Sequence, residues 1–143
     1  MPLLEITDLV LTYRAPDGAR STVLDVPRFT LEAGEQAALA GGSGTGKTSL
    51  LHVIAGLIRP DQGSVVVEGV DVTRLSESTR DAWRARSLGY VFQTFHLLQG
   101  YTALENVLLG MAFGHGMDPR RARDLLERLG LAQRLDYRPR QMS

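Results

Sequence analysis

The sequence lacks cysteine and holds a single lysine among its 143 residues. Without cysteine, the chain can form neither disulfide bonds nor thiolate zinc sites, which fits a reducing compartment. Its 16 basic and 16 acidic residues cancel, so no net positive charge attracts nucleic acid or anionic lipid. We therefore expect no nucleic-acid partner.

Long apolar segments are missing as well. The longest runs from about residue 107 to 113, whereas a membrane-spanning helix needs roughly 20 apolar residues. The first residues, 1–5, have neither the basic start nor the apolar run of a signal peptide. These observations predict a cytoplasmic chain whose contact with a membrane depends on a partner.

The hydrophobic pattern alternates between strands and helices. It predicts strands at residues 9–13, 23–31, 37–40 and 88–92, and a strand ending in a turn at 64–69. Helices are predicted at 48–57, 77–86 and 120–129, the last beginning at Asp118 and Pro119. We expect an α/β fold with an antiparallel N-terminal part and a helical C-terminal part.

The only lysine lies in a glycine-rich segment. Residues Gly41 to Thr48 match the pattern G-x-x-x-x-G-K-[ST], in which glycines let successive backbone amides point at an anion. The following helix adds free amides, and Lys47 adds a compact charge that fits between two phosphates where the planar arginine fork does not. Thr48 offers a hydroxyl to Mg²⁺. The predicted nucleotide-binding residues are Gly41, Gly42, Ser43, Gly44, Thr45, Gly46, Lys47, Thr48 and Ser49.

The loop alone leaves several functions open. A glycine-rich turn between a strand and a helix can match the pattern by chance. Nucleotide kinases, GTPases and transport ATPases share the loop, so the residues around it must decide between them.

The flanking segments narrow this choice. The stretch GEQAALAGGSGTGKTSLLHVIAGLIRPDQGSVVVEG, with LGYVFQTFHLL and TALENV further on, resembles the ATP-binding subunits of ABC transporters. The similarity covers the whole chain and is strongest to the subgroup for lipoprotein release and macrolide export. The chain departs from the family at Gly42, where proline is usual, and at Thr48, where serine is usual. Neither departure removes a required hydrogen-bond donor.

The resemblance implies the fold of an ABC-type P-loop ATPase. It implies a β-subdomain with the P-loop core over 1–93 and a truncated helical subdomain over 94–143, with ATP and Mg²⁺ as cofactors. The implied partners are integral membrane transporter subunits, which select the transported substrate, and a second ATP-binding subunit. These partners would hold the chain on the cytoplasmic face of the inner membrane. A soluble ABC-type ATPase without a membrane partner and a small-molecule kinase stay open as alternatives.

The resemblance also implies roles for two residues outside the loop. Tyr13 stands where the family has an aromatic residue that stacks on adenine, although an ordinary strand tyrosine would look the same. Gln93 matches the Q-loop glutamine, whose amide oxygen would reach Mg²⁺ or the attacking water. A polar residue at the end of a strand is the alternative for Gln93.

The C-terminal residues match only part of a further family motif. Met142 and Ser143 correspond to the first two positions of the Leu-Ser-Gly-Gly-Gln signature. No residue corresponds to the second Mg²⁺-binding aspartate, the water-activating glutamate or the switch histidine. We therefore assign no catalytic residue and expect an incomplete domain that binds nucleotide without hydrolysing it. No metal role is predicted for the histidines, which lack ligand-like spacing: His52, His96 and His115.

Overall fold

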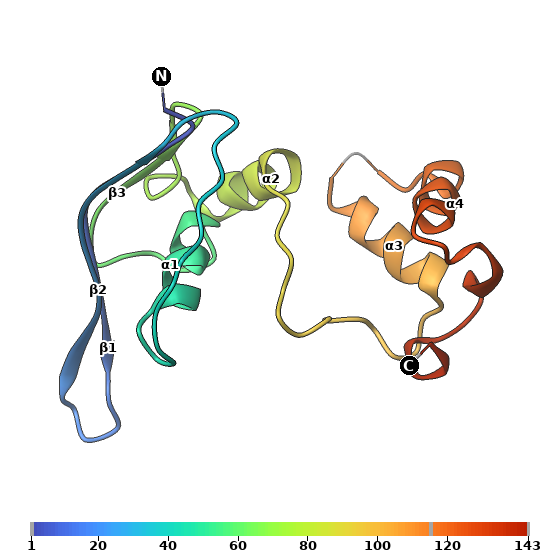
Figure 1. Ribbon diagram of the computed structural model, residues 1–143, viewed down its shortest axis with the longest axis horizontal. Helices are drawn as coiled ribbons and strands as arrows, with labels where there is room; N and C mark the ends of the chain where they lie inside the picture. Colours follow the sequence, from blue (N-terminus) through green and yellow to red (C-terminus); the bar gives the residue numbers. More distant parts are fainter. Residues whose placement is uncertain (1, 115, 143) are drawn as a thin grey trace. The chain divides into compact units, whose positions relative to one another are not determined.

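The structure is a computed structural model that describes residues 2–114 and 116–142. It divides between Arg84 and Ala85 into two compact units (Figure 1). His115, for which no metal role was predicted, and Ser143, which was matched to the signature motif, lie outside the described residues. The domain boundary predicted between residues 93 and 94 stays a prediction.

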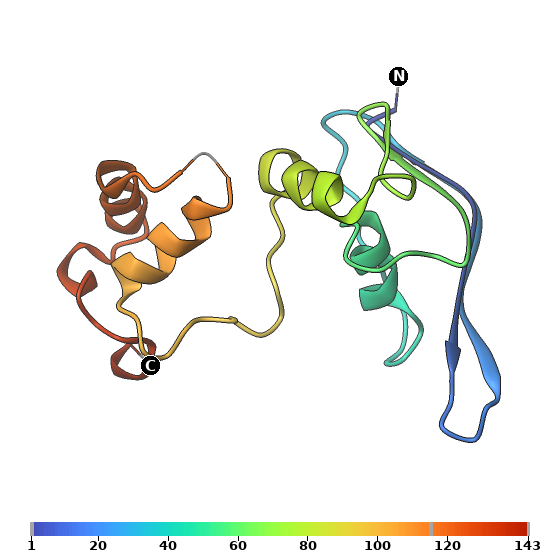
Figure 2. The same cartoon turned by 180° about the vertical axis from the view of Figure 1, so that it is seen from behind.

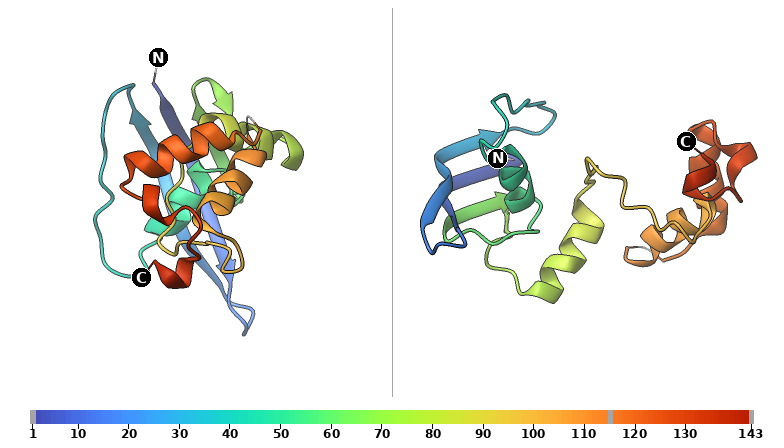
Figure 3. Two further views of the ribbon diagram at one scale, coloured as in Figure 1. Left: turned by 90° about the vertical axis from the view of Figure 1, so that its right-hand side faces the viewer. Right: turned by 90° about the horizontal axis from the view of Figure 1, so that it is seen from below.

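The first unit contains a four-stranded antiparallel sheet with the order β2-β1-β3-β4 (Figure 3). Its strands are β1 (Leu4–Arg14), β2 (Arg20–Leu31), β3 (Gln62–Val67) and β4 (Val70–Asp71). The predicted antiparallel N-terminal part is therefore confirmed. Both strands of the β1–β2 hairpin extend beyond the predicted ranges, because backbone pairing continues through polar residues as far as Arg14 and Arg20.

One face of this sheet carries the core. Ile6 and Leu9 of β1 have no exposed surface, and both face the core because a bulge at Asp8, with φ of 48°, interrupts the alternation between them. Helix α1 (Lys47–Ile54) lies beside the sheet (Figure 2), and its Val53 belongs to this core. Full burial of such a side chain contributes about 1.5–3 kcal/mol to stability. The other fully or nearly buried members of the cluster are Leu4, Leu11, Leu24, Val65 and Val72.

Helix α1 ends at Ile54, earlier than the residue 57 predicted from its apolar spacing. Gly56 follows with φ of 65°, a left-handed conformation that side chains disfavour. Its amide donates to Val53 O at 2.9 Å, and the amide of Leu57 donates to His52 O at 2.8 Å. These two bonds form a Schellman motif, so Gly56 ends the helix before Leu57.

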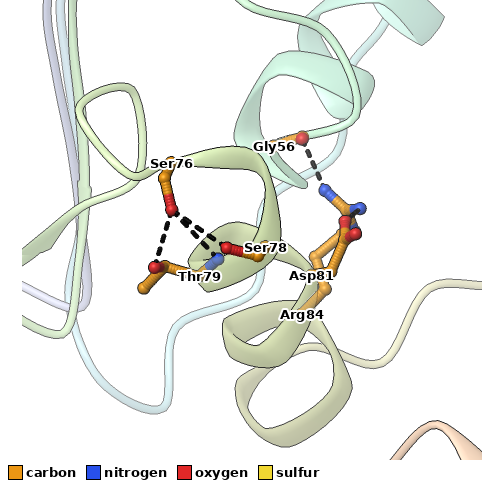
Figure 4. A network of polar contacts seen from close by, with 6 residues as sticks. All are labelled: Gly56, Ser76, Ser78, Thr79, Asp81 and Arg84. Carbon is orange, nitrogen blue, oxygen red and sulfur yellow. Dashed lines mark hydrogen bonds and ion pairs between the residues drawn. The ribbon is translucent and has the colours of Figure 1, made fainter.

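Helix α2 (Glu77–Ser87) confirms the helix predicted at 77–86. Its start is stabilised by the hydroxyl of Ser76, which accepts from the Thr79 amide at 3.3 Å and lies 2.8 Å from the Thr79 hydroxyl. Figure 4 shows this group of polar residues.

Two predicted strands are absent. Residues 37–40 and 88–92 adopt no regular structure, and within them Leu39 is 46% exposed and Val91 is 96% exposed. A strand is stabilised by hydrogen bonds to a neighbouring strand, and none of the strands in residues 2–114 or 116–142 pairs with either segment. The apolar composition of the two segments was therefore not enough to predict a strand.

The second unit is helical, as predicted for the C-terminal part. Thr102 and Glu105 form a capping box at the start of α3 (Ala103–Ala112), and Asp118 caps α4 (Pro119–Arg128) through the amides of the first turn. Two short 3₁₀ helices follow, at Ala132–Arg134 and Pro139–Gln141. Across the part of the chain that the structure describes, no helix is both long and apolar enough to cross a membrane.

Candidate functional site

The glycine-rich loop leads directly into α1, which begins at Lys47. Gly44 and Gly46 have φ angles of 79° and 87°, which favour glycine over all other residues. A Cβ atom on Gly46 would lie 2.6 Å from the carbonyl oxygen of Val23 in β2. Gly46 is thus required both for its conformation and for the close approach of the loop to the sheet.

The start of α1 presents backbone amides that no side chain caps among the described residues. The first helical hydrogen bond runs from the Leu50 amide to Gly46 O at 2.8 Å. The amides of Lys47, Thr48 and Ser49 precede it and have no acceptor within the helix. Such amides, with the positive end of the helix dipole, form a binding site for phosphate oxygens.

The ammonium of Lys47 lies across the loop. Its Nζ donates to Gly41 O at 2.9 Å, to Gly42 O, and to Thr45 Oγ1 at 3.3 Å. Thr45 Oγ1 in turn donates to Gly42 O at 2.9 Å. The positive charge is therefore held within the loop that leads into α1.

Thr48 and Ser49 occupy the first turn of α1. Thr48 is exposed and Ser49 is half-buried. The exposure of Thr48 is compatible with the predicted role of a Mg²⁺ ligand, which requires an oxygen accessible beside the phosphates.

Tyr13 lies near the end of β1 and is 45% exposed. Strand alternation places it on the same sheet face as Leu9 and Leu11, which are buried in the core. Its partner in the ladder is Ser21, two residues before Val23, which contacts the loop at Gly46. The structure thus brings the tyrosine and the loop to the same part of the β1–β2 hairpin.

Asp61 supports this part of β1, and no role was predicted for it from the sequence. Its carboxylate accepts from the amide of Thr12 at 2.6 Å and from the Thr12 hydroxyl at 2.9 Å. These two bonds, aided by the charge of Arg20, hold the pKa of Asp61 below its usual value. Asp61 therefore fixes the strand position next to Tyr13.

Gln93 belongs to the second unit, where it lies exposed in a bend. It does not end a strand, as the sequence pattern suggested, because residues 88–92 form none. Its proposed contact with Mg²⁺ stays a prediction.

A cavity of about 390 Å³ touches the loop at Gly41, Thr45 and Lys47. Its other walls include the carboxylate-bearing Asp25 and the apolar side chains of Val26, Leu39 and Leu50. The carboxylate repels a triphosphate, and the apolar wall offers it no hydrogen-bond donors, so we do not assign the phosphates to this cavity.

The glycine-rich loop, the lysine held across it and the helix that follows define the class of the chain: it has a P-loop fold. A model of the ABC transporter family matches residues 24–143. The chain belongs to the ABC transporter family.

Similar proteins agree with this assignment. The chain is 42% identical over 146 residues to the "Lipoprotein-releasing system ATP-binding protein LolD" of Geobacter metallireducens, covering 99% of this chain and 64% of that protein. It is 37% identical over 145 residues to the "Macrolide export ATP-binding/permease protein MacB" of Bordetella avium, covering 99% of this chain and 22% of that protein. The chain thus spans less than two thirds of the length of these relatives.

A solved structure has the same fold. It is the ATP-binding cassette MJ0796 in a dimeric post-hydrolysis state, bound to ADP and Pi. The two structures superpose with a TM-score of 0.88 at 27% identity, over 98% of this chain and 63% of the other. The α/β fold of an ABC ATPase, predicted from the sequence, is confirmed.

Proposed function

We propose that the chain belongs to the ATP-binding subunit of an ABC transporter and that this subunit couples ATP binding and hydrolysis to transport through membrane partner subunits. The observation that carries the nucleotide-binding part of the proposal is the position of Lys47, whose ammonium lies across a loop that opens onto uncapped helix amides. The transporter part rests on the family match over residues 24–143. A cation and free amides at one place form a binding site for a polyphosphate.

The residues of the loop fit a bound nucleotide with Mg²⁺. The predicted contacts are the amides from Gly42 to Ser49 with the phosphates, Lys47 with the terminal phosphate oxygens, and Thr48 with the metal. Mg²⁺, when bound, neutralises charge on the terminal phosphates. The family resemblance assigns Gln93 a role in positioning water or metal, and this role stays a prediction. The exposure of Thr48 and the left-handed glycines support this assignment.

Tyr13 is the proposed platform for the base. Its half-exposed ring lies on the sheet face that also carries the P-loop helix, as stacking on adenine requires. Stacking of an aromatic side chain on a base contributes about 1–3 kcal/mol.

The proposed partners follow from the relatives. A second ATP-binding subunit is supported by the dimeric cassette structure, and integral membrane subunits by the names of the lipoprotein-releasing and macrolide-export relatives. Hydrolysis is proposed for the complete assembly, with the subunit on the cytoplasmic face of the inner membrane.

Two measurements test this function. Calorimetric titration with Mg²⁺-ATP should give saturable binding that Lys47→Ala weakens strongly, and a matched substitution of an exposed arginine, Arg74→Ala, should leave binding unchanged. Affinity purification from membranes should retain an integral membrane protein. Binding of ATP without any membrane partner would favour a soluble ABC-type ATPase, and phosphate transfer to a small molecule would favour a kinase.

A further inference from the structure

Arg84 of α2 forms a hydrogen bond with the C-terminal end of α1, the helix that follows the glycine-rich loop. Nη1 of Arg84 donates to the carbonyl oxygen of Gly56 at 2.6 Å, across 28 residues of sequence. Gly56 is the left-handed residue that ends α1 (Figure 4). A guanidinium that binds the last carbonyls of a helix also interacts favourably with the negative end of the helix dipole.

The guanidinium of Arg84 is itself held in place. Its Nη2 bonds to the carboxylate of Asp81, one turn earlier on α2 (Figure 4). The Arg84 side chain is only 25% exposed, so solvent screens these contacts less than on an open surface. Asp81 thus orients the guanidinium of Arg84 towards the carbonyl oxygen of Gly56.

A second arginine packs at the same place. Arg80 is 9% exposed, and a Cβ atom on Gly56 would lie 2.9 Å from its Cδ and 3.7 Å from the ring of Trp83. Its Nε and Nη1 have no hydrogen-bond partner among the described residues. Glycine at position 56 therefore allows the α2 side chains to pack directly against the end of α1.

We propose that Arg84 is a positioning residue for the nucleotide site, because it fixes the far end of the helix that carries Lys47. This role rests on the proposed function. The eight residues of α1 form a rod of about 12 Å. The loop end lies directly against β2, since a Cβ atom on Gly46 would reach the Val23 carbonyl oxygen, and the other end is hydrogen-bonded to Arg84. Two fixed ends determine the direction of the helix axis, and hence where the amides and Lys47 are aimed.

The consequence is that a change at α2 alters phosphate binding without touching the phosphates. When the bond to Gly56 is lost, α1 keeps its packing through Val53 but can tilt about the loop. Hydrogen bonds to phosphate oxygens depend strongly on direction, so a tilt weakens them. Binding of the base, which uses β1, is unaffected by the same tilt.

The test compares three variants in the full chain. Arg84→Met keeps the apolar stem and removes the guanidinium, Arg84→Lys restores one charged donor, and Arg86→Ala is a control at an exposed arginine of the same helix. Calorimetry should show about five- to tenfold weaker binding of Mg²⁺-ATP for Arg84→Met, partial recovery for Arg84→Lys and no change for Arg86→Ala. Affinity for adenosine, which has no phosphate, should not change in any variant.

All titrations are made well below the unfolding midpoint of each variant, so that loss of folded protein does not imitate weak binding. Arg84→Met with the parent's affinity for Mg²⁺-ATP overturns the inference, as does an equal loss of ATP and adenosine binding or a failure to fold. If the parent binds Mg²⁺-ATP in a way that depends on Lys47, and Arg84→Met has the same affinity, only the positioning role is overturned. Absence of Mg²⁺-ATP binding by the parent overturns the proposed function instead.

Discussion

Lys47 is the residue whose chemistry most constrains the site. Its ammonium contacts three oxygens that lie within the span of a single tight loop. A compact ammonium with three donors on a flexible stem suits this arrangement, whereas the five donors of arginine lie in one rigid plane. The chain uses arginine at all of its 15 other basic positions, which makes the choice of lysine here informative.

We predict that Lys47→Arg does not restore nucleotide binding. Lys47→Ala should lose a charge-assisted contact worth about 1.5–3 kcal/mol, or roughly tenfold and more in affinity for Mg²⁺-ATP. Lys47→Arg keeps the charge but misplaces it, so calorimetry should give an affinity close to that of the alanine variant. An arginine variant that binds as tightly as the parent would contradict this explanation.

Tyr13 is predicted to act through its ring and not through its hydroxyl. Tyr13→Phe and Tyr13→Trp should retain affinity for Mg²⁺-ATP, because each keeps an aromatic face. Tyr13→Ala should weaken ATP and GTP to a similar degree, by about 1–3 kcal/mol. Competition titrations with the two nucleotides provide the measurement; loss of affinity in the phenylalanine variant would refute stacking as the main contribution.

At the scale of elements, the close approach of β3 to β1 depends on Gly63. This residue has φ of 86°, and a Cβ atom there would lie 2.3 Å from the carbonyl oxygen of Asp8. Gly34 has φ of 84° but nothing within 4 Å of the same position. Alanine at position 34 therefore has only the unfavourable left-handed backbone, whereas alanine at position 63 has the same backbone and a steric clash as well.

We predict that Gly63→Ala destabilises the fold far more than Gly34→Ala does. Gly34→Ala should cost about 1–2 kcal/mol from the left-handed backbone alone. Gly63→Ala carries the same cost and must also push β3 away from the bulge at Asp8, so we expect at least about 2 kcal/mol more. Urea unfolding of both variants measures the difference, and equal destabilisation would show that the strand separation adjusts freely.

The capping box of α3 predicts a pH dependence. The Thr102 amide and hydroxyl hold the pKa of Glu105 below its usual value. A lowered pKa in the folded state gives stability that is present above the ordinary value of about 4.3 and is lost as the pH falls through the folded value. The parent should therefore lose part of its stability in acid through this group.

Glu105→Gln isolates this contribution, because the amide oxygen still accepts from Thr102 but does not titrate. The thermal unfolding midpoint of the parent should exceed that of Glu105→Gln at pH 7, and the difference should shrink below about pH 4. The lowered pKa of Asp61 acts equally in both proteins and cancels. A difference that grows on acidification would have the wrong sign for this mechanism.

For the molecule as a whole, exposed apolar side chains in the second unit predict self-association. Val91 is 96% exposed and Phe95 is 86% exposed, in a segment without strand partners among the described residues. Unpaired backbone and apolar surface together promote association. In sedimentation experiments, the doubly substituted Val91→Glu and Phe95→Glu protein should stay monomeric at concentrations where the parent associates. Gln99→Glu adds charge to the same segment and should not prevent association.

The features that could be predicted are those that depend on residues close together in the sequence. The α4 start follows from Asp118 and Pro119, and the glycine-rich loop is visible as a pattern, so both could be located directly. The strands predicted at 37–40 and 88–92 were wrong, because strand formation depends on a pairing partner elsewhere in the chain. The bond between Arg84 and Gly56 joins positions 28 residues apart, and no local signal marks it.

The loop carbonyls that accept hydrogen bonds from the ammonium of Lys47 compete with phosphate oxygens for that ammonium. A phosphate does not meet a free cation, since the ammonium already has three oxygen acceptors within the loop. Nucleotide entry is therefore an exchange of acceptors, neutral oxygens for charged ones, and the affinity reflects only the difference between them. The internal acceptors keep the loop shaped around a central charge before any nucleotide arrives, so little backbone rearrangement has to accompany the exchange.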